Sequence, residues 1–145
     1  MITKDSRTNA QWRILQLETE SIVSTMTRSA INVHRYPFAL DYIDSPSDFH
    51  EIVRCSPEEL ARYSHMIINY NFSAREHPIV GGLVLAALSA GLKKKDITIY
   101  IPKKSDHVNN VTLDGIHHHR GHVISLFPEL ATRIMDTYTV VIHKG

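Results

Sequence analysis

Residues 64–104 read SHMIINYNFSAREHPIVGGLVLAALSAGLKKKDITIYIPKK, and this stretch decides the fold class. Two short apolar runs, Met66–Tyr70 and Ile97–Ile101, lack the strict alternation of a half-exposed strand, so they predict strands buried on both faces. Between them, Ile79–Leu92 is apolar on nearly every side, which predicts a buried helix. A strand, a helix and a strand in this order form the repeating unit of a parallel α/β sheet.

Further strands and helices are predicted on both sides of this unit. The additional strands are Phe38–Ile43 at an edge of the sheet, Val123–Phe127 and Tyr138–Ile142. The additional helices are Pro46–Arg54, Pro57–Ser64 and Pro128–Asp136, and each has its proline in the first turn, where no intrahelical partner is lost. The sequence therefore predicts a single three-layer α/β domain over residues 1–145, with a mostly parallel central sheet.

The N-terminal segment, residues 1–31, predicts an amphipathic helix that precedes the sheet. Thr8 opens a capping box, and Trp12 begins a stripe of apolar residues at helical spacing. Ile14 and Leu17 fall outside that stripe. A helix that is apolar on more than one side often contacts a second element or a second subunit, and we expect a homo-oligomer that uses residues 8–31.

Composition narrows the class of protein. Of the 145 residues, 43% are hydrophobic and 21% charged, as in an ordinary globular domain, and the net charge of +1 gives no electrostatic reason to expect nucleic acid or a membrane surface as partner. The single cysteine, Cys55, excludes an internal disulfide and a Cys-rich zinc site, and we expect a partly buried structural thiol. Without an apolar leader near Met1, these features predict a cytoplasmic protein.

The loop after Met66–Tyr70 contains the predicted ligand site, because ligands of parallel α/β units bind at the carboxyl ends of strands. The predicted ligand-binding residues are Tyr70, Asn71, Phe72, Ser73, Arg75, Gly81 and Gly82, and the candidates for catalysis are Glu76 and His77. Arg75 has the planar cation that pairs with phosphate or carboxylate, and the two glycines let a ligand approach the helix backbone.

The leading functional prediction is therefore the binding of a small anionic ligand, nucleotide-like or phosphorylated, with Tyr70 or Phe72 stacked on a ring. The competing structural interpretation is that Gly81 and Gly82 only let the helix pack tightly on the sheet. The loop has neither a G-x-G-x-x-G nor a P-loop pattern, so the sequence identifies no cofactor and does not decide whether the ligand is transformed.

Histidine is the outlier of the composition, with ten residues, and residues 116–122 read IHHHRGH. In an extended chain His117 and His119 share one face, and His122 can turn back across Gly121. These three imidazoles predict a zinc or manganese site, completed by Asp114 or by Asp106 and His107, and hence a metal-dependent hydrolase. A solvated loop or hairpin is the commoner explanation of clustered histidines, so the metal site is an alternative to the leading prediction.

A third functional class is a non-enzymatic assembly or accessory protein, for example of a virus, that needs no ligand pocket. Lys93–Lys95 follow the predicted buried helix, where cations complement the helix dipole, so they do not add a phosphate site. No motif is specific enough to assign a family.

Overall fold

The structure is a computed structural model that describes residues 2–6, 10–72, 80–102, 113, 115–121 and 123–144. Its strands are β1 (Trp12–Leu17), β2 (Phe38–Ile43), β3 (His65–Asn69), β4 (Ile97–Ile101) and β5 (His117–Arg120). Its α-helices are α1 (Ser21–Val33), α2 (Pro46–Cys55), α3 (Val80–Ser89) and α4 (Val123–Lys144), and two short 3₁₀ helices are η1 (Pro57–Arg62) and η2 (Lys94–Asp96).

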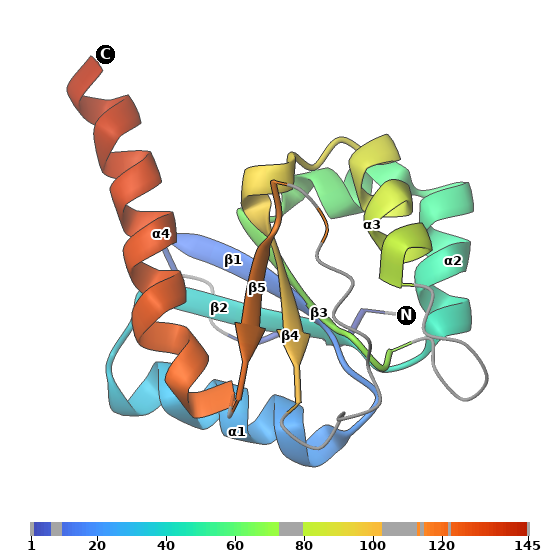
Figure 1. The fold of residues 1–145 in the computed structure, drawn as a ribbon, viewed down its shortest axis with the longest axis horizontal. Helices are drawn as coiled ribbons and strands as arrows, with labels where there is room; N and C mark the ends of the chain where they lie inside the picture. The colour runs from blue at the N-terminus through green and yellow to red at the C-terminus, as the bar shows by residue number, and fades with distance from the viewer. Residues whose placement is uncertain are drawn as a thin grey trace.

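The five strands form one parallel sheet in the order β2-β1-β3-β4-β5 (Figure 1). The chain enters through β1, moves outward to β2, and then returns past β1 to add β3, β4 and β5 on the other side. The prediction of an α/β fold with a parallel sheet is confirmed. Within the described residues, no helix combines the length and apolarity needed to cross a bilayer.

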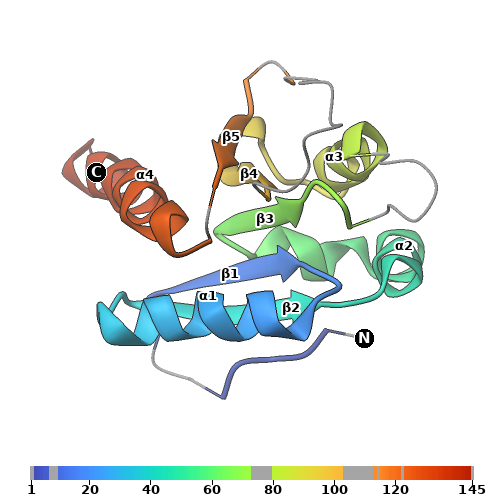
Figure 2. The ribbon, with the colours of Figure 1, turned by 60° about the horizontal axis from the view of Figure 1, so that its bottom comes forward.

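Helices cover both faces of the sheet (Figure 2). Because side chains alternate along a strand, Ile14 of β1 packs on one face with residues of α1 and α4. Its neighbour Leu15 packs on the other face with residues of α2 and α3. Each strand of the centre therefore contributes to two apolar clusters, which explains why Met66–Ile68 is continuously apolar.

The elements nearest the quoted stretch are where the sequence predicts them. β4 has the predicted bounds, β3 begins one residue early, and α3 forms the core of the predicted buried helix. β2 lies at the edge of the sheet, as predicted from Pro37. The predicted helices at Pro46 and Pro57 are also present, although the second is a 3₁₀ helix.

The prediction of an N-terminal helix before the sheet is wrong, because residues 12–17 form β1 and the first helix begins at Ser21. Ile14 and Leu17, which did not fit the helical stripe, are fully buried in the sheet of their own chain. They cannot serve as the interface that suggested a homo-oligomer. On α1, Ile22 and Val33 are the large apolar side chains that stay exposed, and the homo-oligomer itself stays a prediction.

The two predicted C-terminal strands, Val123–Phe127 and Tyr138–Ile142, are wrong as well, since both lie in α4. β-branched residues favoured strands there, but Leu126, Leu130 and Ile134 are buried at intervals of four, which is the period of a helix. Pro128, expected at a helix start, lies inside α4. Cys55 was expected to be partly buried, but it ends α2 and is exposed.

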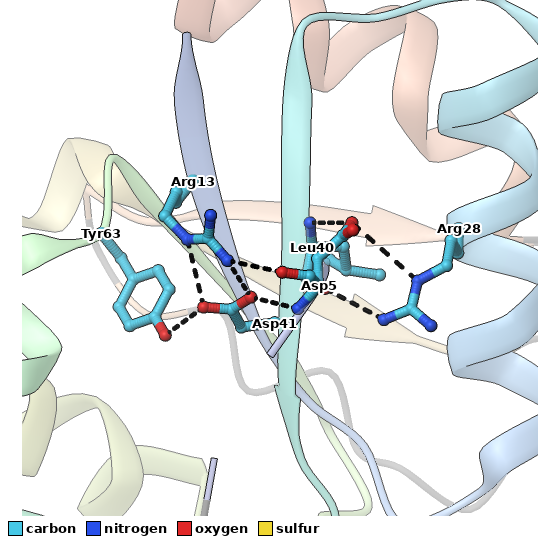
Figure 3. A network of polar contacts seen from close by, with 6 residues as sticks. All are labelled: Asp5, Arg13, Arg28, Leu40, Asp41 and Tyr63. Carbon is cyan, nitrogen blue, oxygen red and sulfur yellow. Dashed lines mark hydrogen bonds and ion pairs between the residues drawn. The ribbon is translucent and has the colours of Figure 1, made fainter. Parts of the chain in front are cut away.

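A buried carboxylate connects the first strands (Figure 3). Asp41 of β2 is fully buried, and Arg13 of β1 donates to both of its oxygens, from Nη2 to Oδ1 at 2.6 Å and from Nε to Oδ2 at 3.3 Å. The Tyr63 hydroxyl donates to Oδ2 at 2.6 Å and the Asp5 backbone N–H to Oδ1 at 2.8 Å. Burial and Asp41 together raise the pKa of Tyr63, so its hydroxyl keeps its proton.

Substitution of Arg13 and substitution of Asp41 should lower the free energy of unfolding by different amounts. Arg13→Ala leaves the Asp41 carboxylate buried without a counter-charge and should lower the free energy of unfolding by about 3–5 kcal/mol. Asp41→Asn leaves Arg13, whose side chain is 34% exposed and can be hydrated, and should cost only about 1–3 kcal/mol. Urea denaturation of both variants measures the difference. A larger loss in Asp41→Asn would contradict this account of the network.

Candidate functional site

The order of strands reverses between β1 and β3. After β1 the chain enters α1 on one face of the sheet, and after β3 it enters α3 on the other face. We call the carboxyl ends of β1 and β3 the switch point. In doubly wound sheets, the helices that follow the two strands at such a position lie on opposite faces of the sheet. The crevice between the carboxyl ends of these strands is the usual place for a ligand. β3, the strand after which the sequence predicts a ligand site, ends at this position in the topology.

A polar side-chain pair bridges the two strands at the switch point. Asn69 Nδ2 donates to Glu18 Oε1 at 2.6 Å, and the Glu20 N–H donates to Glu18 Oε2 at 3.1 Å. Asn69 Oδ1 accepts from the Asn71 N–H at 2.8 Å, which fixes the first turn of the loop after β3. Burial raises the pKa of Glu18, and the hydrogen bonds from Asn69 and Glu20 oppose this shift.

The predicted ligand-binding residues fall into three groups. Tyr70 and Phe72 are buried in the apolar cluster beneath α2 and α3, where the Phe72 ring meets Phe49 edge to face at 6.4 Å. Asn71 is partly exposed, and Gly81 and Gly82 are partly exposed in the first turn of α3. Ser73, Arg75, Glu76 and His77 lie outside the described residues.

No packing contact with the described residues requires a glycine at position 81. A Cβ added to this residue would meet no atom of the described residues within 4 Å. Its backbone is helical, so no positive φ calls for glycine either. By contrast, Gly91 has φ +113°, a conformation that side chains disfavour. Tight packing of the helix against the described residues therefore does not explain Gly81.

A second polar arrangement lies on the face of the sheet that α4 covers. We call it the histidine cluster, and it consists of His65, Thr98, His117, His119, Ser125 and Glu129. His65 Nε2 lies 2.7 Å from Thr98 Oγ1, which lies 3.1 Å from His117 Nδ1. The three side chains come from adjacent strands, β3, β4 and β5.

Glu129 of α4 connects the two histidines of β5. Its Oε1 lies 2.6 Å from His117 Nε2, and its Oε2 lies 3.4 Å from His119 Nδ1. The other ring nitrogen of His119, Nε2, lies 3.0 Å from Ser125 Oγ. His118 points to the opposite face, where its Nε2 accepts from the Leu113 N–H.

The metal prediction placed His117, His119 and His122 in one shell. Within the described residues, no group of three or more His, Cys, Asp or Glu side chains is arranged to hold a metal ion. His117 and His119 instead direct their ring nitrogens at Glu129, Thr98 and Ser125. His122 lies outside the described residues, as do Asp106, His107 and Asp114.

The protonation of two members of the histidine cluster follows from their surroundings. Burial, with smaller electrostatic contributions from the neighbouring Arg133 and His117, lowers the pKa of His65 to about 3. The hydrogen bond from His117 lowers the pKa of Glu129. At neutral pH, His65 is therefore neutral and Glu129 is ionised.

The sequence did not reveal His65, Thr98, Ser125 or Glu129 as partners of the β5 histidines. Ser125 and Glu129 lie four residues apart, which places them on one face of a helix. That relation was hidden because residues 123–127 were assigned to a strand. Glu18 was missed for the converse reason, since the segment that positions it was assigned to a helix.

Comparison of the chain with protein-family models, curated proteins and solved structures finds no match. No relative therefore supplies a substrate, a partner or a catalytic residue. Function has to be inferred from the switch point and the histidine cluster themselves.

The buried imidazole of His65 predicts a specific pH dependence of stability. Its pKa is lower in the folded chain than the ordinary value near 6.5, so the unfolded chain binds the proton more tightly. The stabilisation is complete above pH 6.5 and is lost as the pH falls toward 3, by up to about 1.4 kcal/mol per pH unit.

The substitution His65→Gln tests this dependence, because glutamine keeps an N–H donor for Thr98 but does not titrate. Urea denaturation between pH 4 and 8 should give a smaller acid loss for His65→Gln than for the wild type. His50→Gln, at an exposed histidine of α2, is the control substitution. Equal acid losses for His65→Gln and the wild type would show that His65 is not the buried neutral group.

Proposed function

We propose that this protein binds a small anionic ligand, nucleotide-like or phosphorylated, at the switch point. The observation that carries the proposal is Gly81 at the start of α3, where no described residue would contact an added Cβ and no positive φ calls for glycine. A glycine inside a helix costs about 1 kcal/mol relative to alanine, so its presence calls for another explanation.

Close approach of a ligand to the helix supplies that explanation. The first N–H groups of a helix have no intrahelical acceptor and bear a partial positive charge, which suits phosphate or carboxylate. Gly82, the next residue of α3, is also partly exposed. Arg75 is proposed to pair with the anion from the loop that precedes α3.

The floor of the proposed site is polar and held in place. The Glu18–Asn69 pair joins the ends of β1 and β3, and Asn71 is hydrogen-bonded to Asn69. Tyr70 and Phe72 are buried in the apolar cluster, so they are not proposed to stack on a ring of the ligand. Glu76 and His77 stay candidates for catalysis if the ligand is transformed, whereas a pure binding module needs neither.

A thermal-shift screen against nucleotides and sugar phosphates tests the proposal. Ligand at a hundred times its dissociation constant should stabilise the fold by about 2.7 kcal/mol. Arg75→Ala should abolish the shift. If no compound in the screen raises the melting temperature, the ligand proposal is wrong, and the non-enzymatic assembly interpretation gains.

Gly81→Ala separates a ligand role from a packing role. It should stabilise the unliganded fold by about 0.5–1 kcal/mol, because alanine is the better helix former and the added methyl meets no atom of the described residues. The same methyl should weaken binding of any hit. Gly91→Ala is the matched control, since its positive φ predicts lower stability and unchanged affinity. Unchanged affinity in Gly81→Ala would place the ligand elsewhere.

A further inference from the structure

We propose that Ser125, His119 and Glu129 form a nucleophilic site for acyl transfer, with small carboxylic esters as the class of substrate. Ser125 Oγ lies 3.0 Å from His119 Nε2, and His119 Nδ1 lies 3.4 Å from Glu129 Oε2. A nucleophile, a base and an acid that orients the base, each on the appropriate ring nitrogen, are the components that serine hydrolases of unrelated folds share.

The rest of the histidine cluster fixes the tautomer that this chemistry needs. An ionised carboxylate only accepts hydrogen bonds, so His117 must donate to Glu129 from Nε2 and His119 must donate from Nδ1. In a neutral ring with its hydrogen on Nδ1, His119 Nε2 is unprotonated and faces the Ser125 hydroxyl as an acceptor. The imidazole is therefore held as a base toward Ser125.

The hydrogen bonds from His117 to the buried members of the cluster have a defined direction as well. Because His117 donates from Nε2, its Nδ1 accepts from the Thr98 hydroxyl, and that hydroxyl in turn accepts from His65 Nε2. His65 is neutral and buried, so it can supply this single proton without adding charge. For neutral rings, the hydrogen bonds named above thus take one direction, and one set of tautomers satisfies them.

The nucleophile is accessible. Ser125 is exposed in the first turns of α4, whereas the His119 ring that contacts it is largely buried. Gly121, in the turn between β5 and α4, has φ +127° and carries no side chain over the pair. A Cβ at Gly121 would lie 3.8 Å from Ser125 Oγ and 3.9 Å from His119 Nε2, in contact with both reacting atoms.

The reaction balances without an additional reagent. Ser125 Oγ bonds to the acyl carbon as its proton passes to His119 Nε2, and that proton then protonates the alcohol as the ester C–O bond breaks. Water attacks the acyl-serine, gives one proton to His119, and releases the acid as the proton returns to Ser125 Oγ. Backbone N–H groups at the start of α4 are the donors available to the oxyanion.

This site is independent of the proposed ligand site. It lies on β5, the edge strand, whereas the switch point lies between β1 and β3, with β4 in between. Substitutions at Ser125 and at Gly81 therefore test different proposals, and the failure of one leaves the other standing.

A fluorophosphonate probe tests the proposal, because it phosphonylates serines that are activated by a base. We expect the purified chain to be labelled at Ser125, as mapped by peptide mass spectrometry, and to hydrolyse p-nitrophenyl acetate. Ser125→Ala should remove the label and the hydrolysis, whereas Ser89→Ala, at an exposed serine of α3, should change neither. No label at Ser125 would overturn the proposal.

Glu129→Gln tests the orienting carboxylate. The amide keeps the shape of Glu129 but no longer holds the His119 Nδ1–H as a carboxylate does, so labelling of Ser125 should slow by about 100-fold or more. Glu58→Gln, an exposed acid at the start of η1, is the matched control. Equal labelling rates in Glu129→Gln and the wild type would show that the carboxylate does not orient His119.

The substitution Ser125→Cys gives a second readout that needs no turnover. A thiol beside His119 should be deprotonated more readily than an ordinary thiol, and the native Cys55, which is exposed, provides a reference in the same molecule. Iodoacetamide should alkylate the introduced thiol about tenfold faster than Cys55. Alkylation of both thiols at the same rate would argue against a base at His119.

Discussion

The first half of the sheet depends on how one buried charge is neutralised. Asp41 has no access to water, so its carboxylate must receive all of its hydrogen bonds from the protein. Arg13, Tyr63 and the Asp5 amide supply them from β1, from the end of η1 and from the N-terminal segment (Figure 3). A shift of β1 against β2 would move Arg13 away from Asp41, so this network disfavours other registers of the two strands.

Two further carboxylates have a similar role at other places in the sheet. Glu18 joins the ends of β1 and β3 through Asn69, and Glu129 joins α4 to β5 through His117 and His119. Glu18 contacts a residue 51 positions away in the sequence, whereas Glu129 contacts the strand that directly precedes its own helix. The apolar clusters give the sheet its stability, and these acids fix how neighbouring elements are aligned.

The sequence predicted the centre of the fold well and its ends poorly. For β3, α3 and β4, the apolar runs have one consistent interpretation, because a segment buried on both faces has few polar residues to confuse its period. The apolar residues of Trp12–Leu17 fit the spacing of a helix as well as that of a strand. The segment forms a strand because it pairs with both β2 and β3 in the sheet. In α4, the β-branched residues suggested strands. Every fourth residue is instead buried against the sheet, which is the pattern of a helix.

The same errors limited the prediction of sites. The strand end after β3 could be chosen from topology, and the histidines of β5 stood out by composition. Their partners could not be found, since Thr98 and His65 come from neighbouring strands and Glu129 comes from a segment assigned to the wrong element. Contacts of this kind depend on the order of the strands, which no local pattern contains.

The central claim is that Glu129 sets the direction of the hydrogen bonds that link His65, Thr98, His117, His119 and Ser125. Long-range ¹H–¹⁵N correlation spectra of histidine-labelled protein report the tautomer of each ring directly, and single His→Gln variants assign the signals. At neutral pH, His119 should be protonated on Nδ1, with His117 and His65 protonated on Nε2. A His119 ring protonated on Nε2 alone would contradict the claim, because Ser125 would then face a donor in place of a base.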